Sequence, residues 1–201
     1  MAVNYTVQAE VIDIQSDTPK QDDIFLVDTN VWFWLTYTKA SRSAQAYQTT
    51  AYPSYLVKAI SAQALLLYCG LSLAELAHNI EQTERKIFSA TLKSKEYRHN
   101  YPVQRSNVVA EVEAAWNQVT SIAASTDITV DETRTNASLT RFQSQPLDGY
   151  DLLILEAMAQ AGTVKVITDD SDYVTVPAIQ VFTANYNVIT AARNQSKLLT
   201  R

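Results

Sequence analysis

Short runs of consecutive apolar residues alternate along this chain with longer segments in which apolar residues recur every three or four positions. A continuous apolar run is typical of a strand buried on both faces, and the longer spacing is typical of an amphipathic helix. The apolar runs predict five strands, at residues 24–27, 64–68, 128–130, 164–167 and 179–183.

The periodic segments predict helices between these strands, at residues 31–35, 53–63, 72–90, 103–124, 133–143 and 149–161. Pro53 suits the first turn of its helix, because the N–H group that it lacks is unpaired there in any case. Each parallel crossover needs a long connection, so the alternation indicates an α/β fold. We expect a three-layer α/β/α sandwich with a central, mostly parallel sheet of about five strands.

Polar segments bound this pattern at both ends. Pro19 lies in the polar stretch 16–22 and disfavours regular structure there. We therefore expect an N-terminal extension over residues 1–22, one domain over residues 23–184, and a C-terminal tail or helix over residues 185–201.

Composition limits the location and the partners of the protein. The single cysteine, Cys69, cannot form an internal disulfide, which favours a reducing compartment. The N-terminus has neither a basic start nor a continuous apolar run, so it does not read as a signal peptide, and the run from Ile24 to Leu35 is too short to span a bilayer. We expect a cytoplasmic protein with no membrane partner.

The net charge limits the partners of the protein. The chain has 21 acidic and 16 basic residues and a formal net charge of −5. No bulk positive field would attract a polyanion, so such a partner must be held locally. The candidate cations are Lys86, Lys93, Lys95, Arg98 and Arg105, with Arg134 and Arg141 as further candidates. A solvated helix face is the simpler explanation for them. Tyr97 and Tyr101 either stack on bases or pack beneath their loop.

Acidic residues follow two of the predicted strands directly. Asp28 ends the first strand, and three aspartates follow the fourth, at positions 169, 170 and 172. Glu75 and Asp151 lie early in helices next to these strands. Ligands bind beyond the carboxyl ends of the strands in an open parallel sheet, so we expect these acids to converge there.

Such convergence favours a hard divalent cation, because clustered carboxylates otherwise repel one another. Mg²⁺ and Mn²⁺ prefer oxygen ligands, whereas zinc would require cysteine and histidine, and the chain has only His78 and His99. Each acid also has a structural explanation. Ser72 and Glu75 have capping-box spacing, Asp148 and Asp151 suit a helix N-terminus, and the aspartates after the fourth strand suit a turn. Asp28 is the hardest to explain by structure alone.

Together these residues resemble four ordered motifs of the PIN-domain family, which includes the VapC-like toxin ribonucleases. The motifs are an apolar strand ending in Asp-Thr-Asn, a helix start carrying a glutamate, an aspartate opening an apolar helix, and a strand ending in Thr-x-Asp. They match residues 25–31, 71–76, 151–157 and 166–173.

The resemblance implies a metal-dependent endoribonuclease that hydrolyses RNA phosphodiester bonds. By matching position, the catalytic and metal-binding acids are Asp28, Glu75, Asp151 and Asp170, with Asp172 as an accessory ligand to Mg²⁺ or Mn²⁺. The supporting polar residues are Thr29, Asn30 and Thr168, and the second-choice ligands are Asp148 and Asp169. The resemblance also implies the toxin of a toxin–antitoxin pair, with an antitoxin protein and a homodimer as partners.

One alternative function is open, a second is weakly supported and a third is rejected. The alternative is a catalytically inactive PIN-like module that binds RNA or another protein, and the segment 81–126 exceeds what a minimal toxin needs. A haloacid dehalogenase-type enzyme requires Asp-x-Asp where this chain has Asn30, and a dinucleotide-binding domain requires a glycine-rich turn in a chain that has three glycines.

Overall fold

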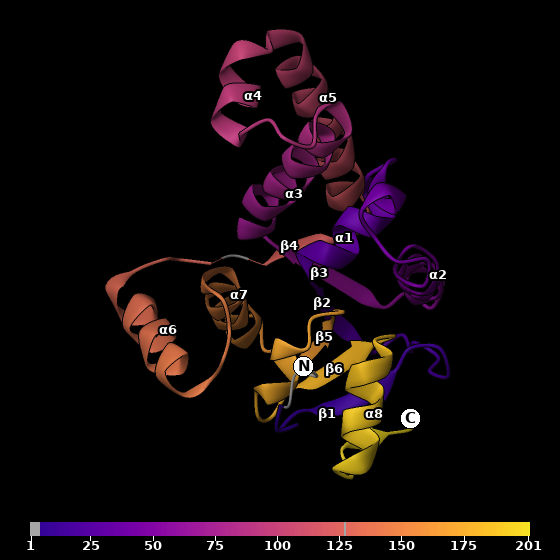
Figure 1. Ribbon diagram of the computed structural model, residues 1–201. Coiled ribbons are helices and arrows are strands. Elements are labelled where there is room, and N and C mark those ends of the chain that lie inside the picture. Colours follow the sequence, from indigo (N-terminus) through magenta and orange to yellow (C-terminus); the bar gives the residue numbers. More distant parts are fainter. Residues whose placement is uncertain (1–4, 127) are drawn as a thin grey trace.

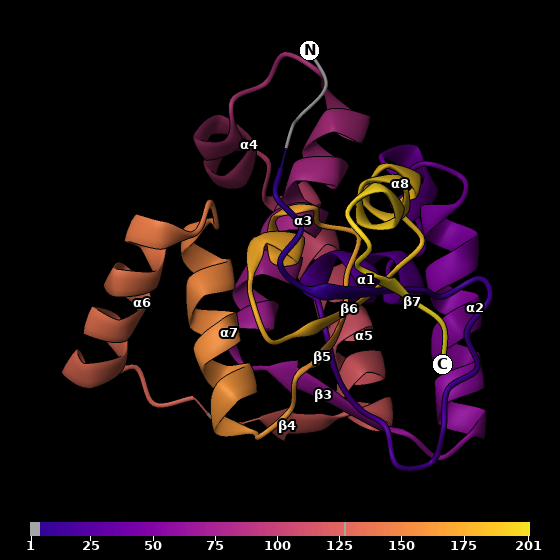
Figure 2. The same ribbon diagram turned by 90° about the horizontal axis from the view of Figure 1, so that it is seen from below.

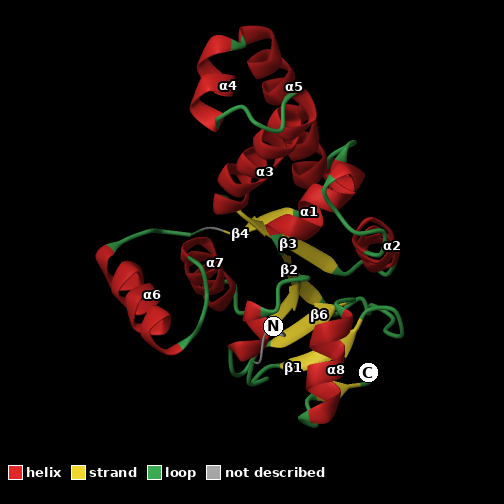
Figure 3. Ribbon diagram, viewed as in Figure 1, coloured by secondary structure: helices red, strands yellow, loops and turns green. Residues whose placement is uncertain are grey.

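The computed structural model describes residues 5–126 and 128–201. Its strands form one parallel sheet in the order β4-β3-β2-β5-β6-β1-β7 (Figures 1 and 3). The strands are β1 Glu10–Asp13, β2 Ile24–Val27, β3 Leu65–Cys69, β4 Ala124–Thr126, β5 Lys165–Ile167, β6 Gln180–Thr183 and β7 Leu198–Leu199.

Helices connect most of these strands. The α-helices are α1 Thr29–Thr36, α2 Gln48–Ser61, α3 Leu71–Phe88, α4 Ser94–Asn100, α5 Pro102–Ile122, α6 Glu132–Ser144, α7 Gly149–Gln160 and α8 Tyr186–Asn194, and the short 3₁₀ helices are η1 Ala40–Arg42 and η2 Asp172–Thr175. Within the described ranges, no helix combines the length and the apolar character needed to cross a bilayer.

The sheet is covered on both faces, as the three-layer expectation requires. Phe25 and Val27 of β2 pack in a core that also contains residues of α1, α2, α3 and α5. Leu26, which lies between them, points to the opposite face and packs in a core formed with α7 and α8. Side chains alternate between the faces of a strand, so an apolar run serves both cores. The predicted α/β sandwich is thus confirmed.

Three helices extend beyond the sheet as a lobe. Figure 1 shows α3, α4 and α5 rising together from the β3 and β4 end, while α6 stands on the outer side of α7, as Figure 2 also shows. The lobe occupies most of the segment 81–126.

The seven described strands exceed the expected five because the two terminal segments add β1 and β7. Residues 10–13, within the expected N-terminal extension, form a strand between β6 and β7, and residues 198–199 pair on its other side. Residues 1–4 lie outside the described residues. Val11 and Ile12 of β1 are buried on opposite faces, but a run this short between polar residues gives a weak sequence signal.

The third strand was predicted wrongly at 128–130, because the structure places it at Ala124–Thr126, paired with β3 from Leu67 to Cys69. Ala124 and Ser125 are exposed at the edge of the sheet, so this strand has no apolar run. Pro53 was also misplaced, since α2 begins at Gln48 and contains Pro53 in its second turn. Burial of Tyr52, Tyr55 and Leu56 holds that helix despite the proline.

β2 lies between β3 and β5, which decides where the acids gather. The chain leaves β2 at Asp28, leaves β3 at Gly70 and leaves β5 at Thr168. Because the three strands are parallel, these exits lie at the same edge of the sheet.

Candidate metal centre

Asp28 lies at the end of β2 and is also the N-cap of α1. Its Oδ1 accepts a hydrogen bond from the Thr29 N–H at 2.6 Å, and its Oδ2 accepts from Asn30 Nδ2 at 2.7 Å and Thr168 Oγ1 at 2.5 Å. The residue is 4% exposed. Three hydrogen-bond donors therefore hold this buried carboxylate at the carboxyl end of β2, between the ends of β3 and β5.

Thr168 connects this carboxylate to the loop after β5. Its hydroxyl donates to Asp28 and accepts a hydrogen bond from the Asp170 N–H at 2.9 Å. The Asp170 carboxylate in turn accepts from the Asp172 N–H at 2.8 Å. The hydrogen-bonded chain places Asp170 next to the Asp28 site.

Asp151 and Asp148 share one helix start but have different partners. Asp148 is exposed and is the N-cap of α7, accepting hydrogen bonds from the N–H groups of Tyr150 and Asp151. Asp151 is buried, and its carboxylate accepts a hydrogen bond of 2.9 Å from the Tyr173 hydroxyl. The capping explanation thus applies to Asp148, while the Asp151 side chain points to the interior.

Tyr173 is a contributor that the sequence analysis did not assign. Its side chain is fully buried, and its hydroxyl holds Asp151. The available signal was its position directly after Asp172 in the fourth motif.

Glu75 has no capping role, contrary to the structural explanation considered for it. α3 begins at Leu71 after the cap residue Gly70, so Glu75 is the fifth residue of the helix and lies too far along to close a capping box. Its Oε2 is buried without a hydrogen-bond partner, as are Thr29 Oγ1 and Asn30 Oδ1. Burial raises the pKa of Glu75, and the nearby Thr29 hydroxyl offsets part of that rise. Three oxygen atoms around Asp28 are therefore unsatisfied, which is costly for buried polar groups.

The carboxylates of the centre influence one another's ionisation. Burial, followed by the charges of Asp151 and Glu75, raises the pKa of Asp28 well above its ordinary value. Burial and the neighbouring charge of Asp148 raise the pKa of Asp151 to about 7. Burial is also the main cause of the raised pKa values of Glu75 and Asp170. Each of these groups is thus harder to ionise in the metal-free protein.

The other buried acids in the described part of the chain form ion pairs with basic side chains. Among the described residues, the buried acids are Asp17, Asp23, Asp28, Glu81, Glu84 and Asp151. Lys or Arg side chains form ion pairs with four of them: Asp17, Asp23, Glu81 and Glu84. Of these six described buried acids, only Asp28 and Asp151 have no ion pair.

Asp169 and Asp172 lie differently from the four central acids. Asp169 turns toward the first turns of α2, where its carboxylate accepts hydrogen bonds from the N-cap residue Tyr47 and from Gln48 and Tyr52 of the helix. Burial, and then the charges of Asp170 and Asp148, raise the pKa of Asp172. Asp169 is thus held away from the centre, and Asp172 lies at its margin.

The chemistry of the carboxylates fits a hard divalent cation, because their donor atoms are all oxygen and one of these atoms, Glu75 Oε2, is buried without a hydrogen-bond partner. Their present positions do not enclose an ion. Within residues 5–126 and 128–201, no three His, Cys, Asp or Glu side chains are grouped so that they could hold a metal. Coordination by three carboxylates would therefore require side-chain rotation.

The two tyrosines considered for stacking on RNA bases, and the two tryptophans expected in the core or in a dimer contact, all make packing contacts within the chain. Tyr97 is buried and, like Tyr101, packs against Phe88, so both tyrosines are packing residues. Trp32 is fully buried, and Trp34 packs against Tyr52.

No model of a known protein family matches the chain, and no curated protein matches it.

Proposed function

We propose that this protein is a metal-dependent endoribonuclease that hydrolyses RNA phosphodiester bonds. The proposed ligands of Mg²⁺ or Mn²⁺ are Asp28, Glu75, Asp151 and Asp170, with Asp172 as an accessory ligand. One observation carries the proposal: the two buried acids without an ion pair among the described residues, Asp28 and Asp151, are both at this centre. Buried carboxylates are stabilised by cations, so a cation that the chain itself does not supply is the natural partner.

The residues of the centre have separable roles in this proposal. A bound divalent cation lowers the pKa of a water molecule and stabilises negative charge on phosphate oxygens during in-line displacement. Asp28 is held by three donors and provides the fixed anchor. The Asp151 carboxylate is oriented by Tyr173, and its pKa of about 7 in the metal-free protein means that a cation binding there near neutral pH competes with a proton. Glu75 has a free Oε2 that can accept a proton from water.

RNA cleavage tests the proposal directly. Purified wild type, Asp28→Asn and Asp22→Asn are incubated with a mixed RNA pool in Mn²⁺, Mg²⁺ or EDTA, and the cleavage ends are mapped. Asp22 is exposed and serves as the matched control. The proposal expects cleavage by wild type and Asp22→Asn in metal only, and its loss in Asp28→Asn. Equal cleavage by Asp28→Asn would reject the assigned centre.

The second candidate is a PIN-like module without catalytic activity, and the lack of a preformed three-ligand group among the described residues favours it. Such a module would bind RNA or a protein and give no metal-dependent cleavage. An antitoxin partner and a homodimer stay predictions of the family resemblance, to be tested by co-purification and by the mass of the protein in solution.

A further inference from the structure

A small pocket lies at the far end of α1 and α3 from the acidic centre. Its volume is about 280 Å³, and it is lined by Arg42, Ser43, Thr83, Lys86 and Ile87. The first two of these residues end the short helix η1, which follows α1, and the other three lie in the last two turns of α3. Two separate segments of the chain therefore form the pocket.

The pocket carries two positive charges and is lined by no acid. Arg42 and Lys86 are both exposed, and neither forms an ion pair with a described residue. Glu84 of α3 and Glu111 of α5 both bind Lys39, and neither of these acids lines the pocket. A hollow lined by charge of one sign raises the local concentration of the opposite ion, so this pocket favours an anion.

The helix dipole explains only part of this arrangement. Lys86 is in the last turn of α3, where a cation is favourable for any helix. Arg42 reaches the same pocket from η1, and that helix has three residues, too few for a large dipole. The Ser43 hydroxyl adds a third donor, because its hydrogen bond to the Ala40 carbonyl is long at 3.3 Å. A guanidinium, an ammonium and a hydroxyl thus surround one space.

We propose that this pocket binds a phosphate group. The planar fork of a guanidinium binds two phosphate oxygens at once, and an ammonium adds a point charge. The backbone of an RNA strand is one source of such a group, and a free phosphate compound is the other. The pocket does not require the acidic centre to be a nuclease.

The position of the pocket sets a minimum length for an RNA that also reaches the acidic centre. Glu75, Asn79, Thr83 and Lys86 follow one another at intervals of four, four and three residues, so they form one stripe along α3. Lys86 lies eleven residues after Glu75, about 16 Å along the helix axis at ~1.5 Å per residue. A stacked strand has a phosphate roughly every 3.4 Å, so about five nucleotides span that distance.

Two titrations in EDTA test the pocket separately from catalysis. In the first, inorganic phosphate is added at constant ionic strength and the amide chemical shifts of the protein are recorded. In the second, a fluorescein-labelled single-stranded RNA of about ten nucleotides, longer than the stripe, is followed by anisotropy. The pocket variants are Arg42→Ala and Lys86→Ala. Arg193→Ala and Lys58→Ala are the matched controls, because both residues are exposed on other helices.

Each pocket variant should raise the Kd for RNA, for inorganic phosphate or for both by about fivefold or more, and the controls should change neither. An effect on RNA identifies the strand backbone as the source, and the slope of log Kd against log salt concentration should then fall by about one. An effect on inorganic phosphate alone identifies a free phosphate compound. Arg42→Lys keeps the charge and should stay within about twofold of wild type.

Equal Kd values in the pocket and control variants for both probes, or no binding of either probe by wild type, would overturn the assignment of this pocket. Both pocket side chains are exposed and without an ion pair among the described residues, so their removal should leave the fold intact. Metal-dependent cleavage is scored independently. A phosphate pocket on a protein without nuclease activity and a nuclease without this pocket therefore give different results.

Discussion

Asp151 is the residue at which the effect of burying an acid in the metal-free centre on the free energy of unfolding is easiest to measure. Its carboxyl has a pKa of about 7, raised mainly by burial and by the charge of Asp148. Between the ordinary value near 4 and this value, the folded protein holds a proton that the unfolded chain has released. Asp151 therefore makes the protein less stable as the pH rises through that window.

We predict that Asp151→Asn stabilises the metal-free protein at pH 7 by on the order of 1 to 3 kcal/mol, because the amide is never charged. It can still accept the hydrogen bond from Tyr173. Urea unfolding at several pH values measures the effect, which should vanish near pH 4. Asp22→Asn, at an exposed site, should change the stability little at either pH. If Asp151→Asn is less stable than wild type at pH 7, then ionisation of the buried Asp151 carboxyl does not destabilise the metal-free protein.

The sequence alone could assign some of the acids to the centre and not others. Asp28 could be singled out because a charge at the end of a buried strand is costly without a partner. The sequence did not separate Asp151 from Asp148, since both suit a helix start, and only the structure shows that Asp148 caps the backbone. The sequence also did not place Asp169, whose partners on α2 are more than a hundred positions away.

At the scale of elements, α2 determines the shape of the acidic loop after β5. The Tyr52 hydroxyl is within hydrogen-bonding distance of the Asp169 carboxylate at 2.6 Å and accepts from the Ala184 N–H at 3.0 Å. Asp169 is thereby held against the helix, and the neighbouring Asp170 is left to face Asp28 through Thr168.

We predict that Tyr52→Phe destabilises the protein by about 1 to 3 kcal/mol, because it leaves the buried Ala184 N–H without a partner. The variant should also bind Mn²⁺ more weakly, since the loop that carries Asp170 is less fixed. Chemical denaturation and a Mn²⁺ titration measure the two effects. Tyr186→Phe is the control, because Tyr186 is 74% exposed. A Tyr52→Phe protein with wild-type stability would contradict the role given to α2.

The elements themselves were predictable where burial determines the sequence pattern. β2 and β3 are surrounded on both faces, so their apolar runs are continuous. β4 is exposed at one edge and carries Ala124 and Ser125, which gave no apolar signal. β1 and β7 depend on pairing between the two ends of the chain, and no local pattern encodes that pairing.

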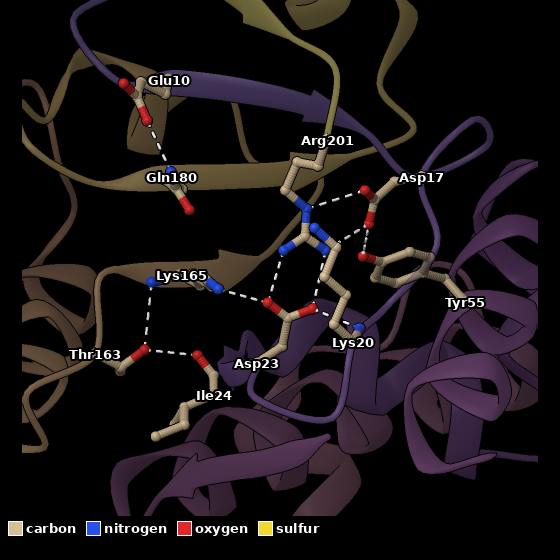
Figure 4. A network of polar contacts seen from close by, with 10 residues as sticks. All are labelled: Glu10, Asp17, Lys20, Asp23, Ile24, Tyr55, Thr163, Lys165, Gln180 and Arg201. Atoms are coloured by element: carbon tan, nitrogen blue, oxygen red, sulfur yellow. Dashed lines mark hydrogen bonds and ion pairs between the residues drawn. The ribbon is translucent and has the colours of Figure 1, made fainter. Parts of the chain in front are cut away.

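Across the whole molecule, acids at the two ends of the sheet have opposite environments. At the amino ends of β2 and β5, Arg201 binds both Asp17 and Asp23, and Lys165 also binds Asp23 (Figure 4). The Arg201 guanidinium also lies 4.6 Å from the centre of the Phe182 ring. These contacts attach residues 198–201 to the sheet.

We predict that Arg201→Ala lowers the free energy of unfolding by about 3 kcal/mol at neutral pH, because it leaves two buried carboxylates short of a partner. Burial alone would raise the pKa of Asp23, but hydrogen bonds from Arg201 and Lys165 hold it below its ordinary value. This stabilisation is therefore present above about pH 4 and is lost as the pH falls through the folded-state pKa.

Unfolding measured from pH 7 down to pH 3 should show the difference between wild type and Arg201→Ala shrinking with acid. Arg193→Ala is the matched control, since that arginine is exposed on α8. A difference that is constant with pH would mean that Arg201 acts through packing on Phe182 and not through its carboxylate partners.

The most direct test of the central claim is Mn²⁺ binding near pH 7.5, measured by the loss of the electron paramagnetic resonance signal of free Mn²⁺. Wild type and Asp22→Asn should bind the ion, and Asp28→Asn should bind it at least tenfold more weakly. A hundredfold excess of Mn²⁺ over its Kd should also stabilise wild type by about 2.7 kcal/mol. Equal binding by wild type and Asp28→Asn, or no binding by either, would contradict the assignment of this centre as a metal site.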